Sequence, residues 1–111
     1  MAKKTKLLDH LWSKAVKKRA GNQCEVCGSQ GTLHAHHIFS RRFYSLRWDL
    51  ENGVCLCFKH HFGYAHQDPI NFYEWVKQRR DLDYLKSKKN KTGKTDYTAI
   101  ELYLKNELNK R

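Results

Sequence analysis

Histidine and cysteine are crowded into the middle of this chain, and this crowding constrains its fold more than any other feature. Six of the seven histidines and all four cysteines lie between Cys24 and His66. Paired imidazoles are expensive on a surface and poorly suited to a core, but they are good metal ligands. A chain of 111 residues forms one small domain with a modest core. We therefore expect bound metal to complete that core.

Two pairs of side chains with the same spacing predict a closed zinc site. Two residues separate Cys24 from Cys27, and two residues separate Cys57 from His60. Zinc takes four sulfur or nitrogen ligands in a tetrahedron, and four protein ligands leave no position for a substrate. Cys55 competes with Cys57, because both occupy the same face of a strand, and we prefer Cys57 for its spacing to His60. The alternative is a small core that contains four free cysteines.

The charge balance predicts a polyanionic partner. The chain has 22 lysines and arginines against 11 acidic residues, a formal net charge of +11. Nucleic acid, bound through salt-sensitive phosphate contacts, is the first candidate. The alternative is a basic excess without function.

The composition also predicts a compartment. No apolar run is long enough for a transmembrane helix, and no apolar stretch follows the basic start at 1–6. We therefore expect no membrane contact and a reducing cytoplasm, where cysteines act as metal ligands more often than as disulfides.

Periodicity and end signals predict a single α+β domain over 1–111. Gly21 is a stop signal for the first helix, and Asp68 with Pro69 is a start signal for a later one. Two short strands and a helix that starts near Lys59 are expected in the metal-rich region. The expected order is a helix over 7–20, the metal-rich core over 22–67, a helix over 69–85, a basic linker over 86–95 and a helix over 96–110.

A second group of side chains predicts hydrolytic chemistry. His36 and His37 are neighbours on an expected strand, so their side chains point to opposite sides. One of them should bind a metal and the other should act as a base. Phosphodiester hydrolysis needs an activated water and a cation that neutralises charge on the phosphate, and neutral imidazole is a suitable base near pH 7.

The stretch from Cys24 to His66 resembles the HNH endonucleases, also called the ββα-metal or His-Me finger family. The matching residues are the pair His36 and His37, then Asn52, then His61. Many members also carry a zinc-binding cysteine set around this motif. The longer run over 11–79 looks most like phage-encoded HNH proteins, including recombination proteins of the NinG type.

The resemblance implies a fold and a set of roles. It implies a ββα-metal hairpin-plus-helix core stabilised by a structural zinc and flanked by N- and C-terminal helices. His36 and His61 would bind a divalent catalytic metal (Mg²⁺, Mn²⁺, Ni²⁺ or Zn²⁺), His37 would be the general base, and Asn52 would orient that base and its loop. The implied activity is metal-dependent hydrolysis of DNA that leaves a 5′-phosphate and a 3′-hydroxyl.

Three positions in this region stay open. His66 is a candidate third metal ligand, but five residues on a regular helix turn it about 140° away from His61. His34 shares a strand face with His36 and either supports the metal site or is an ordinary polar residue. Arg42, in a loop with Arg41 and Arg47, is a candidate phosphate contact through its fork of donors.

The main alternative is a zinc-stabilised nucleic-acid-binding module without catalysis. An adaptor with protein partners in phage recombination or packaging is a third reading, suggested by the basic C-terminal third. A binding module needs only Cys24, Cys27, Cys57 and His60. The additional histidines therefore favour the nuclease.

Overall fold

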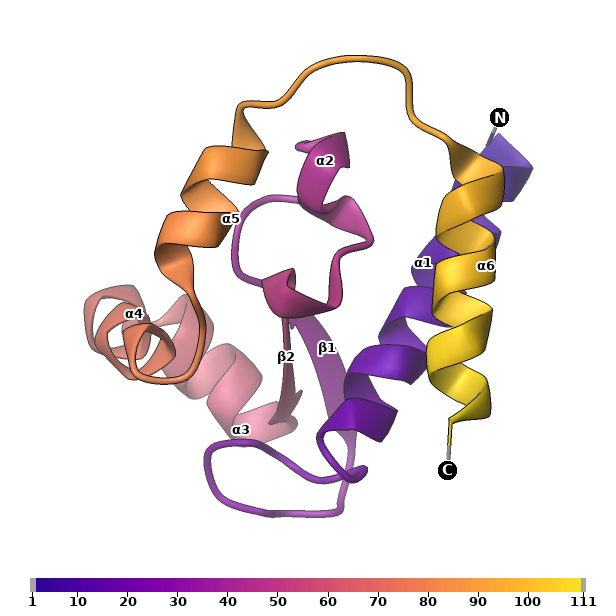
Figure 1. Cartoon of the computed structure of the whole chain (residues 1–111). Coiled ribbons are helices and arrows are strands. Elements are labelled where there is room, and N and C mark those ends of the chain that lie inside the picture. The colour runs from indigo at the N-terminus through magenta and orange to yellow at the C-terminus, as the bar shows by residue number, and fades with distance from the viewer. Residues whose placement is uncertain (1, 111) are drawn as a thin grey trace.

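A two-stranded antiparallel hairpin forms the centre of the fold, and helices cover it on two sides (Figure 1). The computed structural model describes residues 2–110. Over these residues the chain forms six helices and this one sheet, a small α+β fold as predicted. Strand β1 (Leu33–His37) pairs with β2 (Gly53–Cys57) in a register that sets Leu33 opposite Cys57 and His37 opposite Gly53.

The first helix, α1 (Ala2–Arg19), packs across the hairpin and against the last helix, α6 (Tyr97–Asn109). It starts earlier than the predicted 7–20, and it ends where Gly21 adopts a φ of +72°, a conformation that favours glycine. The hairpin approaches α1 so closely that a β-carbon on Gly53 would lie 2.5 Å from Val16 Cγ2. Gly53 therefore permits the contact between helix and sheet.

The connection between the strands, expected to be irregular, contains two short helical turns. These are α2 (Tyr44–Arg47) and the 3₁₀ turn η1 (Leu50–Asn52). After β2 the chain enters α3 (Phe58–His60), which continues into a π-helical turn, η2 (His61–His66). Helix α4 (Pro69–Lys77) follows with Pro69 in its first turn, as predicted.

The predicted helix over 69–85 is wrong, because two helices occupy this region. Helix α4 ends at Lys77, and α5 (Leu82–Lys89) begins after Asp81, whose carboxylate accepts a hydrogen bond from the Tyr84 N–H. Between them lies Arg80, whose guanidinium donates to the Gly53 carbonyl and to Glu25. This contact turns the chain back toward the sheet.

The other C-terminal boundaries shift as a result. The predicted linker over 86–95 is too long at its start, because α5 continues to Lys89, and the non-helical segment is 90–96. The last helix begins at Tyr97 with Asp96 as its N-cap, close to the predicted 96–110. Asp68 does occupy the N-cap position of α4, but its carboxylate accepts from the Asn71 side chain rather than from a helix N–H.

Two groups of buried side chains stabilise the fold, one on each side of the hairpin. The first lies between the sheet and α4 and α5, and it includes Leu46, Val54, Leu56, Phe72, Val76, Leu82 and Leu85. The second lies under α1 and α6, and it includes Leu8, Leu11, Trp12, Ala15, Val16, Trp48, Leu50, Cys55 and Leu104. Among residues 2–110, no helix combines the length and the hydropathy needed to cross a membrane.

Candidate metal centres

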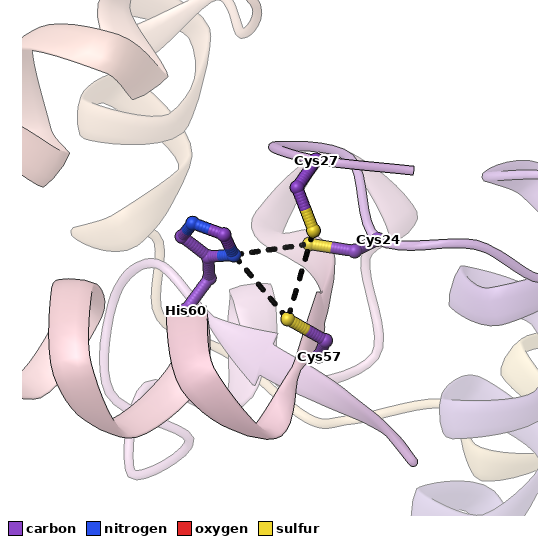
Figure 2. Close-up of side chains that lie close together, drawn as sticks. All are labelled: Cys24, Cys27, Cys57 and His60. Carbon is purple, nitrogen blue, oxygen red and sulfur yellow. Dashed lines mark hydrogen bonds between the residues drawn. The ribbon is translucent and has the colours of Figure 1, made fainter. Parts of the chain in front are cut away.

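Four side chains converge at the end of β2 and form what we call the cysteine cluster: Cys24, Cys27, Cys57 and His60 (Figure 2). The sulfurs of Cys27 and Cys57 lie 3.8 Å apart. Nδ1 of His60 lies 3.3 Å from the Cys57 sulfur and 3.9 Å from the Cys24 sulfur. These are the four residues that the sequence spacing predicted to come together.

These separations match a tetrahedral zinc site. Zinc–sulfur bonds of about 2.3 Å and zinc–nitrogen bonds of about 2.0 Å place two sulfurs about 3.8 Å apart and a sulfur and a nitrogen about 3.6 Å apart. A disulfide would need about 2.05 Å between sulfurs, and all four cysteines are free. The donor set and its spacing therefore fit zinc, so the cysteine cluster could hold a closed, structural ion.

The turn from Cys24 to Gly28 is fixed to the sheet by backbone contacts. Gly28 N–H donates to the Cys24 carbonyl, which closes the turn. Glu25 N–H donates to the Cys55 carbonyl, and the Glu25 carboxylate accepts from Cys55 N–H. The same carboxylate accepts from Arg80 at 2.8 Å, and Arg80 is mostly buried. These contacts fix the turn to the sheet without using the side chains of the cysteine cluster.

Cys55, the competitor for Cys57, is outside the cysteine cluster. Its side chain is fully buried in the core under α1. Burial, together with the nearby Glu25, raises the pKa of this thiol to about 11. Its place in this core keeps Cys55 out of the ligand set, whereas Cys57 lies where β2 turns into α3, with its sulfur 3.3 Å from His60 Nδ1.

A second group, the histidine cluster, joins β1 to η2. It contains His36, His61 and His66, whose candidate ligand nitrogens all lie within 4.8 Å of one another. Nε2 of His66 is 3.2 Å from Nε2 of His61, close to the ~3.3 Å expected between two nitrogens on one tetrahedral zinc. Three side chains that held a tetrahedral ion would leave its fourth coordination position free for water or a substrate.

The π-helical turn explains how His66 reaches His61. A π-helix makes i→i+5 hydrogen bonds, so residues five apart in sequence lie one turn apart and face the same side. Within η2 the two imidazole centroids are 4.7 Å apart. The 140° rotation expected for a regular helix does not apply here, because the helix is locally wound more loosely. Such turns are rare and often occur at functional sites.

Burial and repulsion from neighbouring imidazoles lower the pKa of two members of the histidine cluster, His36 and His61. Burial, followed by repulsion from His61 and His66, lowers the pKa of His36 to about 4. Burial and the neighbouring His66 likewise lower the pKa of His61. Nδ1 of His61 is also buried without a hydrogen-bond partner. Neutral imidazoles with available lone pairs are what a metal ion binds, so this donor set fits a divalent cation.

His34 lies beside the histidine cluster but is not one of its ligands. Its ring stacks on His61 with centroids 4.9 Å apart and meets the edge of Phe62. Its Nε2 is buried without a hydrogen-bond partner. His34 therefore packs against a candidate ligand.

His37 points to the opposite side of β1 from His36. Its Nε2 lies 2.9 Å from the Arg47 carbonyl, and its ring stacks on Trp12 with centroids 3.9 Å apart and planes 7° apart. Burial lowers the pKa of His37 and outweighs the hydrogen bond to Arg47, which raises it. Because only a protonated nitrogen can donate to a carbonyl, Nε2 carries the proton and Nδ1 keeps a lone pair.

Asn52 fixes the loop that supplies this carbonyl. Its side chain is fully buried; Oδ1 accepts from Phe39 N–H at 2.8 Å, and Nδ2 donates to the carbonyls of Phe39 and Leu46. The loop between Phe39 and Arg47 is thus tied to the start of β2. The Leu46 carbonyl that Asn52 binds directly precedes Arg47, whose carbonyl contacts His37.

Sequence reasoning missed the residues of α1 that hold the same loop. The Asp9 carboxylate accepts two hydrogen bonds from the Arg47 guanidinium and one from Trp48 Nε1. Trp12 Nε1 donates to the Asp49 carbonyl. The sequence did contain a signal for Asp9. It is the sole acidic residue between positions 2 and 19, and it lies one helical turn before Trp12.

Arg42, the candidate phosphate contact, is exposed at the loop edge. Its guanidinium lies over the Phe43 ring, 5.2 Å from the centroid. Arg47, in contrast, forms an ion pair with Asp9.

Comparisons with family models, curated proteins and solved structures find no match for this chain. The functional interpretation therefore depends on the chain's own residues.

Proposed function

We propose that this protein is a metal-dependent DNA endonuclease of the HNH type, with the hairpin, α3 and η2 as its ββα-metal core. The main support for the proposal is that two consecutive histidines lie in different surroundings. His36 joins two other histidines in an open ligand set. His37 faces away from them and is held by a backbone carbonyl as a neutral base. Hydrolysis of a phosphodiester needs both functions close together.

The proposed base acts through its free nitrogen. Because Nε2 of His37 donates to Arg47, Nδ1 is left to accept the proton of the attacking water. The water oxygen then forms a bond to phosphorus and the bond to the 3′-oxygen breaks. The 3′-oxygen takes a proton from solvent water, which leaves a 5′-phosphate and a 3′-hydroxyl. A divalent cation held by His36, His61 and His66 would neutralise charge on the phosphate and the departing oxygen.

The cysteine cluster has a different part in the proposal. Its four side chains could hold one zinc ion, which would stabilise the fold and would leave no coordination position for the substrate. It joins the Cys24–Gly28 turn to the end of β2, next to the helical turn that carries His61. We further propose the reducing cytoplasm of a bacterial host as the compartment, since thiolate zinc sites persist there, and phage recombination or packaging as a setting for protein partners.

The proposal is tested by titrating a divalent metal into a plasmid-nicking assay. His36→Ala and His61→Ala should cleave slowly and recover in part at high metal concentration, because each removes one ligand. His66→Ala should behave in the same way if the π-helical turn serves the metal. His10→Ala, an exposed histidine on α1, is the matched control and should cleave like the wild type.

A zinc-stabilised DNA-binding module is the second candidate function. The cysteine cluster and the net charge of +11 are sufficient for it. It gives no role to the histidine cluster or to the Arg47 carbonyl that orients His37. If all metals fail to support nicking while duplex DNA still binds, this second candidate replaces the nuclease.

A further inference from the structure

A groove lies between α2, α5, the 90–96 segment and the first turns of α6. Its volume is about 770 Å³, within the ~300–1,000 Å³ typical of pockets that enclose small organic groups. Figure 1 shows the 90–96 segment arching above α2 on its way to α6. None of the residues that line the groove is a histidine or a cysteine, so the groove is separate from both ligand clusters.

The groove carries an excess of positive charge. Its basic lining residues are Arg42, Lys88, Lys89, Lys91 and Lys94, and its acidic ones are Asp49 and Asp96. Both acids are already engaged. The Asp49 carboxylate accepts from Lys88 at 2.7 Å and from the Tyr84 hydroxyl at 2.6 Å, and Asp96 caps α6. The remaining cations favour an anionic ligand.

Each helical wall of the groove also presents one partly exposed tyrosine. Tyr44 on α2, Tyr84 on α5 and Tyr103 on α6 are 42%, 40% and 42% exposed. Two of these rings are held in place. Tyr84 is fixed by its hydroxyl bond to Asp49, and Tyr44 packs edge-on against Trp48 with centroids 5.3 Å apart. The groove therefore offers oriented aromatic surfaces next to free cations.

We propose that this groove binds a single-stranded segment of nucleic acid. Aromatic rings stack on unpaired bases while lysines and arginines contact the phosphates, and the combination is typical of single-strand binding sites. A duplex keeps the faces of its bases stacked inside, so it cannot use the tyrosines. An acidic peptide would engage the cations but leave the rings without partners. The groove thus adds a strand-holding site to the proposed nuclease and does not depend on cleavage.

The test measures fluorescence anisotropy of a labelled oligothymidylate without added divalent metal, so that no cleavage occurs. An abasic oligonucleotide of the same length carries the phosphates without the bases. Tyr103→Ala should weaken oligothymidylate binding about tenfold, the loss expected for one stacked base, and leave abasic binding unchanged. Tyr103→Phe keeps the ring and should bind normally. Leu102→Ala, the exposed neighbour outside the groove, is the matched control.

The cationic contribution has its own test. The double variant Lys91→Ala with Lys94→Ala should reduce the slope of log affinity against log salt by about 1.4, because each phosphate contact to a single strand contributes about 0.7. Lys6→Ala with Lys14→Ala removes the same charge from α1, outside the groove, and should change the slope less.

Three results would overturn the proposal. Tyr103→Ala could leave oligothymidylate binding unchanged, oligoglutamate could compete as well as oligothymidylate, or a duplex could bind with the same dependence on Tyr103. Loss of nicking in His37→Ala with normal oligothymidylate binding supports both proposals. Normal nicking by that variant removes the nuclease proposal alone.

Discussion

At the scale of single residues, hydrogen bonds separate the roles of side chains that look alike in the sequence. His36 and His37 are neighbours, yet one lies among imidazoles and the other donates to the Arg47 carbonyl. Cys55 and Cys57 are two residues apart, yet one is a buried core thiol and the other lies 3.3 Å from His60. Sequence spacing was enough to select Cys57.

The two cysteines give a direct prediction. Cys57→Ser should lose zinc and much of the folding free energy, because binding energy at a structural zinc is also folding energy. Cys55→Ser should keep its zinc, since the thiol is outside the cluster. Elemental analysis and thermal unfolding measure both effects. Equal zinc content in the two variants would mean that the ligand set is assigned incorrectly.

Asn52 supports a second prediction at this scale. Asn52→Ala leaves Phe39 N–H and the carbonyls of Phe39 and Leu46 without their side-chain partner. The free energy of unfolding should fall by about 2–4 kcal/mol, because unsatisfied buried polar groups cost about 1–3 kcal/mol each. The rate of plasmid nicking should fall while zinc content stays normal. A variant that loses stability but nicks at the wild-type rate would show that Asn52 does not position His37.

The cysteine cluster could be selected from the sequence because each of its two pairs has a local, two-residue spacing, whereas Asn52 was selected only through the resemblance to the HNH endonucleases. The contacts of Asp9 and Trp12 could not be selected in this way. They connect α1 to residues 47–49, which are far apart in sequence and meet only when the second core forms. Only a structure shows that this helix holds the loop that positions His37.

At the scale of elements, two local departures from regular helical geometry shape the surroundings of the candidate ligands. The π-helical turn η2 brings His61 and His66 to one side, although their sequence spacing argues against it in a regular helix. The separation of α4 from α5 allows Arg80 to reach Glu25 and Gly53. The sequence pattern of apolar residues continues through this break, so periodicity alone predicted one helix.

The close approach of α1 to the hairpin predicts the effect of two glycine substitutions. In Gly53→Ala the new methyl group would meet Val16 and Trp12 at 2.5 and 2.8 Å. Such overpacking should lower the free energy of unfolding by about 1–3 kcal/mol. Gly63→Ala is the control, because among residues 2–110 nothing beyond its own helical turn lies within 4 Å of its β-carbon position, and it should be neutral or slightly stabilising. Denaturant unfolding compares the two, and equal losses would contradict the packing described.

At the scale of the whole molecule, charge determines how DNA should bind. With a net charge of +11, duplex affinity should fall steeply as salt rises, because each phosphate contact releases counterions. Fluorescence anisotropy at several salt concentrations gives the slope. A flat profile would point to a protein partner instead.

The central claim is that His37 is the base of a metal-dependent nuclease, and one measurement tests it most directly. The nicking rate of supercoiled plasmid is compared between wild type and His37→Ala at saturating Mn²⁺, with zinc content and DNA affinity measured alongside. We expect the nicking rate of His37→Ala to fall at least about a hundredfold, the usual contribution of a general base, with zinc content and DNA affinity unchanged. Nicking by His37→Ala at the wild-type rate would contradict it.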